Sequence, residues 1–308
     1  MIPKASSIAA TVDNIFLFIV GISVVLLVAI TFLMVYFTIK YRRSKNIPPA
    51  NIEGHTLLEV TWTVVPTILV MAMFYYGWVG FKEMRTVPKG AAVVKVTGRM
   101  WSWSFEYENG RQTKVLKLPV GKPVKLELKS LDVIHAFYVA AFRVKEDVVP
   151  GLNNYISFTP TIVGTYDAQC AEYCGLRHSY MMAKVEVMPE KDFQEWYSAN
   201  GKVAKEEAAE KGLTGGELLD VKGCLGCHTT DGSPLVGPTF KGIFGRKETV
   251  ETEGKERQVV VDEDYIRKSM VEPQSDIVVG FPPIMPSQEG IVTEEEMEQI
   301  ISYLKELK

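Results

Sequence analysis

The chain has 308 residues, of which 47% are hydrophobic and 23% charged, and its formal net charge is −3 at pH 7. This length accommodates two soluble domains together with a membrane anchor. The slightly acidic balance argues against a nucleic-acid partner, and we expect the membrane and other proteins instead. Only four cysteines are present, and both pairs fall in redox-type motifs, so none is left for a structural disulfide.

Two uncharged apolar stretches near the N-terminus predict a membrane anchor. Residues 14–39 and 60–81 contain no charged side chain, and each exceeds the roughly 20 residues needed to cross a bilayer. A cleaved signal peptide is the alternative for the first stretch. Its apolar run is longer than the about 7–15 residues of a signal-peptide core, and no small-residue cleavage motif follows. We therefore predict a transmembrane helical hairpin over residues 1–85.

Basic residues predict the orientation of this hairpin. The connection between the two stretches contains four of them, Lys40, Arg42, Arg43 and Lys45, whereas only Lys4 precedes the first stretch. Positively charged loops stay in the cytoplasm. Both termini and all of the soluble chain should therefore lie on the outer, periplasmic side of a bacterial inner membrane.

Residues 86–189 have the pattern of a small β-sandwich. Segments such as Ala-Val-Val-Lys-Val-Thr and Ala-Lys-Val-Glu-Val-Met alternate apolar and polar residues between Gly and Pro turns. Residues 190–211 are charged and rich in alanine, which is typical of a partly helical linker. Residues 212–308 contain three helical patterns, at 216–222, 262–271 and 293–307, and predict an all-α domain.

A twelve-residue segment near the end of the sandwich concentrates metal-binding side chains. It reads Cys170-Ala-Glu-Tyr-Cys174-Gly-Leu-Arg-His178-Ser-Tyr-Met181. Thiolate, imidazole and thioether ligands suit copper, whereas methionine is a poor ligand for zinc. A local disulfide or half of a zinc site is the alternative, and the added His178 and Met181 argue against both.

The other two cysteines form Cys224-Leu-Gly-Cys227-His228, the pattern of a c-type haem attachment site. His228 is then the proximal iron ligand. The distal ligand of such domains is often methionine, and two candidates follow, Met270 and Met285. Met270 falls within a helical pattern that favours a core role, whereas Met285 lies in the rigid Phe-Pro-Pro-Ile-Met-Pro segment, so we predict Met285. Met297 is expected in the core.

The twelve-residue segment resembles the binuclear CuA loop of cytochrome c oxidase subunit II. Asp132-Val-Ile-His135 resembles the upstream ligand segment of that family, and the appended haem motif resembles the fused cytochrome c of caa-type oxidases. The resemblance implies a cupredoxin domain in which the two thiolates bridge two copper ions. The implied ligands are His135, Cys170, the Glu172 carbonyl, Cys174, His178 and Met181.

The resemblance also suggests roles for three further residues. Trp101, in the aromatic stripe Trp101-Ser-Trp103-Ser-Phe105, matches the residue through which electrons reach CuA, although plain strand packing is the alternative. The family has tyrosine where Ser102 stands here. Glu59 matches a glutamate at the mouth of a proton channel, and the Glu172 side chain could bind magnesium shared with the catalytic subunit.

With four histidines in the chain, three of them already used, too few remain for an oxygen-reducing centre. The predicted function is thus the electron-input subunit of a haem–copper oxidase, which passes electrons from a donor cytochrome or quinol-oxidising complex through haem c to CuA. Catalytic subunit I and other membrane subunits are the expected partners. Two alternatives stay open: the same role in a CuA-containing nitric oxide reductase, and a free-standing membrane-tethered electron carrier.

Charge is divided unevenly between the two parts of the chain. Residues 1–189 carry 20 basic and 13 acidic side chains, whereas residues 190–308 carry 14 and 24. An acidic solvated surface is the simpler interpretation. Docking of the acidic haem domain onto the more basic copper domain, or onto a basic donor, is the alternative.

Overall fold

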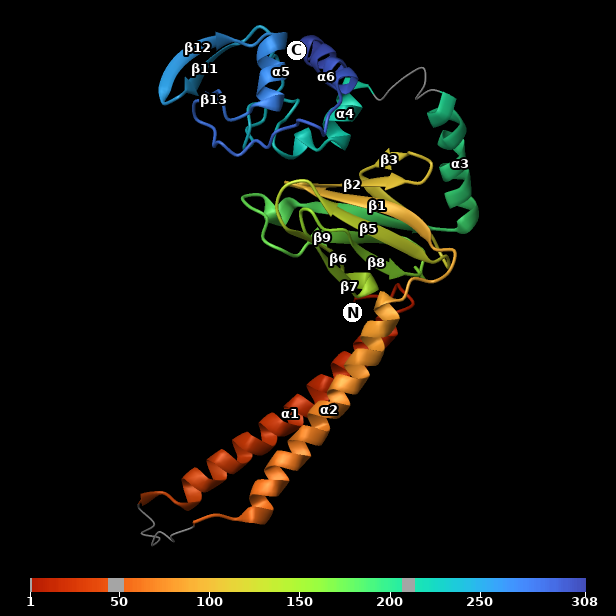
Figure 1. Cartoon of the computed structure of the whole chain (residues 1–308), viewed down its shortest axis with the longest axis vertical. Helices are drawn as coiled ribbons and strands as arrows, with labels where there is room; N and C mark the ends of the chain where they lie inside the picture. Colours follow the sequence, from red (N-terminus) through yellow and green to blue (C-terminus); the bar gives the residue numbers. More distant parts are fainter. Residues whose placement is uncertain (1, 44–52, 207–213) are drawn as a thin grey trace.

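The computed structural model describes residues 2–43, 53–206 and 214–308, without the side chains of residues 199–206. Figure 1 shows three parts stacked along the long axis: a helical hairpin, a β-sandwich, and a C-terminal domain at the end far from the hairpin. Lys45, residues 207–211 of the predicted linker and the first two residues of the predicted haem domain lie outside the described residues.

The hairpin consists of α1 (Ala9–Lys40) and α2 (Thr56–Arg85), both longer than the uncharged stretches that predicted them. By length and composition each can cross a membrane. The helices come closest near the soluble domains, where a Cβ on Gly80 would lie 2.5 Å from Ile15 Cδ1. His55, for which the sequence suggested no role, caps α2 by accepting a hydrogen bond from the Leu58 amide at 3.2 Å.

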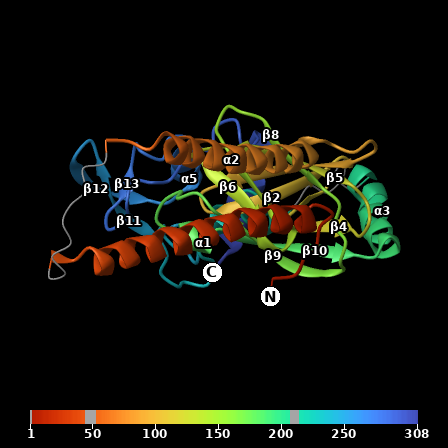
Figure 2. The ribbon, with the colours of Figure 1, turned by 90° about the horizontal axis from the view of Figure 1, so that it is seen from below.

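Both helices are attached to the sandwich. The N-terminal segment before α1 lies in the sandwich, where Ala5 is fully buried and the Ser6 hydroxyl donates to the Phe142 carbonyl at 2.7 Å. Arg143 Nε donates to Asp13 of α1 at 2.8 Å. The view from below shows the two helices running beneath the β-strands (Figure 2).

The sandwich has two five-stranded sheets, in the orders β3-β2-β1-β5-β8 and β4-β10-β9-β6-β7. The β1–β5 and β4–β10 pairs are parallel and the others antiparallel. The strands are β1 (Ala92–Arg99), β2 (Ser102–Tyr107), β3 (Gln112–Thr113), β4 (Val115–Pro119), β5 (Val124–Ser130), β6 (His135–Val139), β7 (Val144–Val148), β8 (Asn154–Phe158), β9 (Gly164–Cys170) and β10 (Met182–Met188).

The alternating pattern of these strands produces the core, because every second side chain points between the sheets. In β2, Trp103, Phe105 and Tyr107 are buried while the residues between them are only partly covered. Trp103 and Phe105 both make edge contacts with Phe137 of the opposite sheet, at ring-centroid distances of 5.1 and 6.1 Å. This packing holds β6, and with it His135, in a fixed position.

The segment predicted as a linker begins with α3 (Glu190–Glu206). Its first turns pack on the sandwich, where Phe193 is buried and Trp196 contacts Tyr107 at 5.1 Å between ring centroids. The Arg111 guanidinium stacks over the Trp196 ring at 3.9 Å. The start of this segment is therefore attached to the copper domain.

The C-terminal domain contains α4 (Gly215–Val221), α5 (Glu263–Val271) and α6 (Glu294–Glu306), close to the predicted helices. Capping boxes begin α4 at Thr214 and α6 at Thr293. The domain differs from the all-α prediction because it also carries a three-stranded sheet, β12-β11-β13. These strands are β11 (Lys247–Thr252), β12 (Lys255–Val260) and β13 (Ile277–Val278).

The β11–β12 hairpin turns at Glu253 and Gly254, whose φ angles are 50° and 78°. Two consecutive positive φ angles are the geometry of a tight hairpin turn. Half of the residues in each strand are charged, so the alternation of apolar and polar residues is weak there. This composition explains why the sequence pattern did not predict the sheet.

Candidate metal centres

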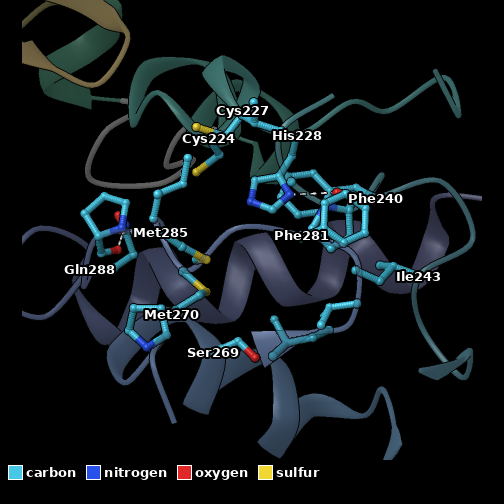
Figure 3. A pocket seen from close by; sticks show the side chains of 18 of the residues that line it. Cys224, Cys227, His228, Phe240, Ile243, Ser269, Met270, Phe281, Met285 and Gln288 are labelled. Carbon is cyan, nitrogen blue, oxygen red and sulfur yellow. Dashed lines mark hydrogen bonds between the residues drawn. The ribbon is translucent and has the colours of Figure 1, made fainter. Parts of the chain in front are cut away.

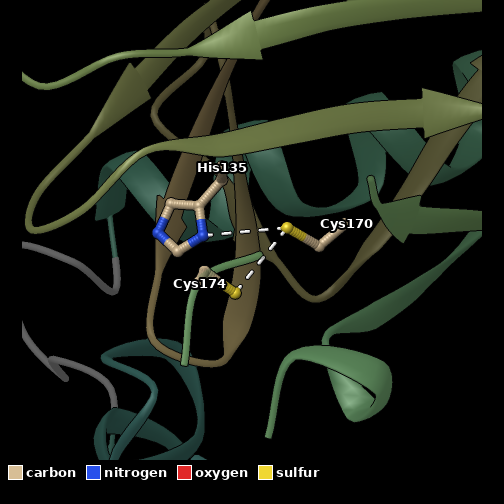
Figure 4. A group of neighbouring side chains, drawn as sticks. All are labelled: His135, Cys170 and Cys174. Atoms are coloured by element: carbon tan, nitrogen blue, oxygen red, sulfur yellow. Dashed lines mark hydrogen bonds between the residues drawn. The ribbon is translucent and has the colours of Figure 1, made fainter. Parts of the chain in front are cut away.

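The copper-loop residues, 170–181, bring their ligand atoms together at one end of the sandwich. β9 ends at Cys170, and the loop then turns back through a short 3₁₀ helix, His178–Tyr180, into β10. Cys170 Sγ lies 3.7 Å from Cys174 Sγ and 3.8 Å from His135 Nδ1, as Figure 4 shows. The ligand atoms of these three residues all lie within 4.8 Å of one another.

The other expected ligands complete this cluster. Cys174 Sγ lies 3.5 Å from His178 Nδ1 and 3.7 Å from Met181 Sδ, and Cys170 Sγ lies 3.2 Å from the Glu172 carbonyl oxygen. All six atoms that the sequence singled out thus converge. Each thiol faces its own imidazole, which is the arrangement that two metal ions bridged by two sulfur atoms require.

The two cysteines of this cluster do not form a disulfide. The two sulfur atoms are 3.7 Å apart, far beyond the 2.03–2.05 Å of a disulfide bond, and all four cysteines are free. Cys170, Cys174, His135 and Met181 are buried, which keeps water away from soft ligands. This donor set of thiolates, imidazoles and a thioether fits copper.

Asp132 fixes the orientation of His135. Its Oδ1 accepts a hydrogen bond from His135 Nε2 at 2.8 Å, and its Oδ2 accepts from the Met100 amide at 2.7 Å. Nδ1 is therefore the nitrogen that faces Cys170, and a carboxylate on the far ring nitrogen also increases the basicity of a metal-binding imidazole. The spacing Asp-x-x-His was visible in the sequence, but this role was missed.

Electrostatics in the cluster favour a shared proton when no metal is bound. The hydrogen bond between the two thiols lowers the pKa of Cys170 and raises that of Cys174, because the pair holds one proton between them. Burial lowers the pKa of His135, but the hydrogen bonds to Asp132 and Cys170 outweigh it and leave that pKa above its usual value. Metal binding would displace these protons.

The haem motif lines a second cavity, in the C-terminal domain (Figure 3). Cys224, Cys227 and His228 stand on its wall, and the space unfilled by protein, with the open mouth included, is about 1330 Å³. His228 Nδ1 is hydrogen-bonded to the Pro238 carbonyl at 2.7 Å, so Nε2 is the nitrogen left for iron. Burial lowers the pKa of His228, which keeps the ring neutral, as a ligand must be.

The backbone beside His228 is adapted to this ring. A Cβ on Gly237 would lie 2.7 Å from His228 Cε1, so only glycine leaves room for the imidazole there. Phe240 stacks on the other side, with ring centroids 4.4 Å apart. A large, mostly apolar cavity with two free thiols and an oriented neutral histidine on its wall fits a covalently attached haem.

Both methionine candidates for the distal position line this cavity (Figure 3). Met270 is buried and belongs to the hydrophobic core of the domain, whereas Met285 is only half-buried. The Met285 segment is held on α5, since the Ser287 hydroxyl donates to the Val271 carbonyl at 2.6 Å. Met297 is in the core, and Met285 stays the predicted ligand.

The haem motif lies directly against the copper domain. Arg177 of the copper loop donates to the Gly226 carbonyl, and Arg99 Nη1 donates to the Lys222 carbonyl at 2.9 Å. A Cβ on Gly223 would lie only 2.5 Å from Ser102 Oγ. The small Ser102, where the resembling family has tyrosine, thus permits close approach of the two domains.

Trp101 lies between the two centres. It is only 6% exposed, and its Nε1 donates to the Cys174 carbonyl at 3.1 Å. On its other side, a Cβ on Gly226 would lie 3.4 Å from the Trp101 amide nitrogen. Trp101 therefore contacts both the copper loop and the haem motif.

Two other predicted residues are exposed. Glu59 is in the first turn of α2, at the hairpin end remote from the soluble domains, and its Oε1 accepts from the His55 amide at 3.2 Å. The Glu172 side chain is exposed, although its carbonyl faces the copper cluster. Neither position tests the proton or magnesium role.

Three family models match the chain. They are the cytochrome c oxidase subunit II transmembrane domain over residues 1–78, the cytochrome c oxidase subunit II periplasmic domain over residues 111–188, and cytochrome c over residues 213–308. Together they account for the hairpin, most of the sandwich and the C-terminal domain.

Relatives agree with these matches. Cytochrome c oxidase subunit 2 of Alkalihalophilus pseudofirmus is 30% identical over 321 residues, which cover 99% of this chain and 90% of the relative. Alternative cytochrome c oxidase subunit 2 of Bradyrhizobium diazoefficiens is 33% identical, over 54% of this chain and 72% of the relative. The crystal structure of the periplasmic domain of subunit II from Bradyrhizobium japonicum is 31% identical, covers 40% of this chain and 99% of that chain, and has a TM-score of 0.36.

Proposed function

This chain belongs to the cytochrome c oxidase subunit II family and carries a fused cytochrome c domain, and we propose that it transfers electrons from haem c to CuA within one polypeptide. As such a subunit it has an electron-input role in a membrane-bound haem–copper oxidase. The family matches confirm the predicted architecture of hairpin, cupredoxin-like sandwich and cytochrome c domain. They also imply both CuA and haem c as cofactors.

In the copper domain, His135, Cys170, Cys174, His178, Met181 and the Glu172 carbonyl would hold the metal pair. A copper pair held by these residues would supply a one-electron centre. The residues of the chain contribute rigidity: β6 and β9 supply His135 and Cys170, and Asp132 fixes the His135 ring. A site whose ligands cannot move needs little reorganisation when its charge changes, which favours rapid electron transfer.

In the C-terminal domain, Cys224 and Cys227 would attach the haem, and His228 and Met285 would bind its iron. Haem c supplies a second one-electron centre. The Pro238 carbonyl orients His228, and the mostly apolar wall excludes water. A methionine–histidine pair raises the reduction potential relative to other axial pairs, which suits a centre that accepts electrons from a donor protein.

The contact of the two domains is the observation that carries the proposal. Gly226, which precedes Cys227, abuts the Met100–Trp101 backbone, and Trp101 is hydrogen-bonded to the carbonyl of the copper ligand Cys174. Bonded and contacting atoms therefore run from the haem motif to the copper loop without an intervening layer of solvent. We propose Trp101 as the connecting residue of this path.

The partners follow from the shared role of the family. Subunit II associates with subunit I of a haem–copper oxidase in a membrane complex, and we propose that oxygen is reduced there and not in this chain. The exposed carboxylate of Glu172 is available for a magnesium ion shared with that subunit. Glu59, at the opposite end of the hairpin, would serve proton uptake from the cytoplasm, and a cytochrome or quinol-oxidising complex would be the donor.

Spectroscopy and kinetics of the purified complex test this function. Electron paramagnetic resonance of the oxidised protein should show one unpaired electron spread over two copper nuclei, and flash photolysis should show haem-to-CuA transfer. A spectrum of isolated copper, or stoichiometric zinc, would refute the copper assignment. Consumption of nitric oxide in place of oxygen would favour the nitric oxide reductase alternative.

The dependence of the haem-to-CuA transfer rate on ionic strength tests whether charge helps the haem domain to dock on the copper domain. Residues 190–308 carry a net charge of −10, and residues 86–189 a net charge of +4. Exposed charges are screened beyond about 8–10 Å at 0.1–0.15 M salt, while the connection through the chain already keeps the domains at high effective concentration. Haem-to-CuA transfer should therefore slow moderately as salt rises, and a rate that is flat or increases would rule out electrostatic docking.

A further inference from the structure

Arg99, at the end of β1 in the copper domain, lines the cavity of the C-terminal domain. Together with Met100 it stands on the same wall as Cys224, Cys227 and His228. Only 8% of Arg99 is exposed, and its Nη1 donates to the Lys222 carbonyl at 2.9 Å. The copper domain thus provides part of the haem site.

Arg99 differs from the other charged residues of this cavity wall. Asp276 is neutralised by Arg257 and Lys268, at 2.7 and 2.8 Å, and Glu248 is paired with Arg246 at 2.6 Å. Among the described side chains, no ion pair of Arg99 with a carboxylate is present. Its hydrogen bond goes to a backbone carbonyl, which leaves the positive charge uncompensated.

Neighbouring charged residues do not neutralise Arg99 either. Asp132 is the carboxylate with electrostatic influence on Arg99, but its oxygens are bound to His135 and to the Met100 and Val133 amides. Lys114 and Arg177, further cations at the junction, add positive charge near Cys224 and Cys227. Burial lowers the pKa of Arg99, yet a guanidinium stays charged at neutral pH.

From this geometry we infer that Arg99 is a residue of the copper domain that raises the reduction potential of haem c. The inference rests on the haem site proposed above. Reduction removes one positive charge from the iron, so a fixed cation nearby stabilises the reduced state. In a buried site with little solvent this interaction is much stronger than in water. The potential of the haem then depends on the docked position of the other domain.

Redox titration of the haem in the purified complex tests the inference with two neutral variants. Arg99→Gln retains a hydrogen-bond donor, and Arg99→Met replaces the buried cation by an unbranched apolar side chain. At the ambient potential where the parent is half reduced, we expect the ratio of oxidised to reduced haem to rise about tenfold. That change corresponds to 59 mV for a one-electron couple.

Two further variants distinguish an effect of the Arg99 charge on the haem potential from an effect of its packing. Arg99→Lys keeps the charge, and its ratio should stay within about twofold of the parent. Lys95→Gln removes a cation from the same strand, but Lys95 is exposed and paired with Glu106 at 2.9 Å, so the ratio should not change. Covalent haem content and the copper spectrum report separately whether the parent and each variant contain both centres.

Each result of the redox titrations supports or overturns the inferred role of Arg99. A shift in both neutral variants that Arg99→Lys prevents supports the inference. Unchanged potentials in the neutral variants would overturn it. An equal shift in Arg99→Lys would also overturn it, because packing and not charge would then be the cause. A parent without covalent haem would instead refute the proposed function.

Discussion

Removal of the Asp132 carboxylate should weaken copper binding without touching a copper ligand. Asp132→Ala deletes the acceptor of two buried hydrogen bonds, from His135 Nε2 at 2.8 Å and from the Met100 amide at 2.7 Å. The His135 ring is fully buried, so its Nε2 cannot turn to water for a replacement. We therefore expect both a less oriented imidazole and an unsatisfied backbone donor.

The magnitude follows from these two losses. Loss of a carboxylate behind a metal-binding histidine typically reduces metal affinity 10–100-fold, or about 1.4–2.8 kcal/mol. The unsatisfied Met100 amide costs about 1–3 kcal/mol of folding stability. Competition of the purified protein against a copper chelator measures the first loss, and thermal unfolding of the copper-free protein measures the second.

Matched variants define the result that would refute this reasoning. Asp147 of the adjacent strand β7 is exposed and paired with the exposed Lys145 at 3.2 Å, so Asp147→Ala should leave copper affinity unchanged. Asp132→Asn keeps one acceptor oxygen and should have an intermediate effect. Copper affinity of Asp132→Ala within twofold of the parent would show that the strands alone orient His135.

Three further predictions concern the haem domain and its junction. Met285→Ala should abolish the sulfur-to-iron charge-transfer band and lower the haem potential, and the assignment is wrong if Met270→Ala does this instead. Ser102→Tyr should slow haem-to-CuA transfer, because a large side chain would displace Gly223; flash photolysis at the parent rate would contradict the close approach. Hydrogen bonds with Lys268, Thr252 and Arg257 outweigh burial and lower the pKa of Asp276 to about 2. Asp276→Asn should therefore destabilise the domain by about 1–2 kcal/mol at pH 7, after allowance for its half-exposed partners. This stabilisation is present above the unfolded pKa of about 4 and lost as pH falls towards 2, so denaturant unfolding of parent and variant should converge there; a constant difference would refute the linkage.

The sequence was most informative where function restricts residue type. A membrane span needs an uncharged run, so the hairpin could be predicted from composition. The thiolates, imidazole and thioether of residues 170–181 indicated a copper site, and the resemblance to the family supplied its full ligand set. The structure brings His135 to Cys170 across 35 positions, as the resemblance implied. Whether Met285, Trp101 and Glu59 have their predicted roles is for experiment to test.

Other features depend on contacts that local patterns do not contain. The junction of Gly223 with Ser102 joins residues 121 positions apart, and neither residue has a chemistry that predicts the other. Asp132 carries a common acidic side chain whose importance comes only from the burial of His135. The β11–β12 hairpin escaped prediction because half of its strand residues are charged, and the turn at Gly254 was the one clear local signal.

The attachment of the N-terminal segment to the sandwich has a consequence for biosynthesis. Ala5 is enclosed by strands and turns that include Ala141 and Thr161, since its amide donates to the Ala141 carbonyl and its carbonyl accepts from the Thr161 amide, both at 2.9 Å. The segment around Ala5 is therefore synthesised before its partners, which follow more than 130 positions later in the chain. Ala5 precedes the hairpin and the strands follow it, so the sandwich can be completed only after both helices have been inserted with these two segments on the same side of the membrane. Completion of the soluble fold therefore depends on correct membrane topology.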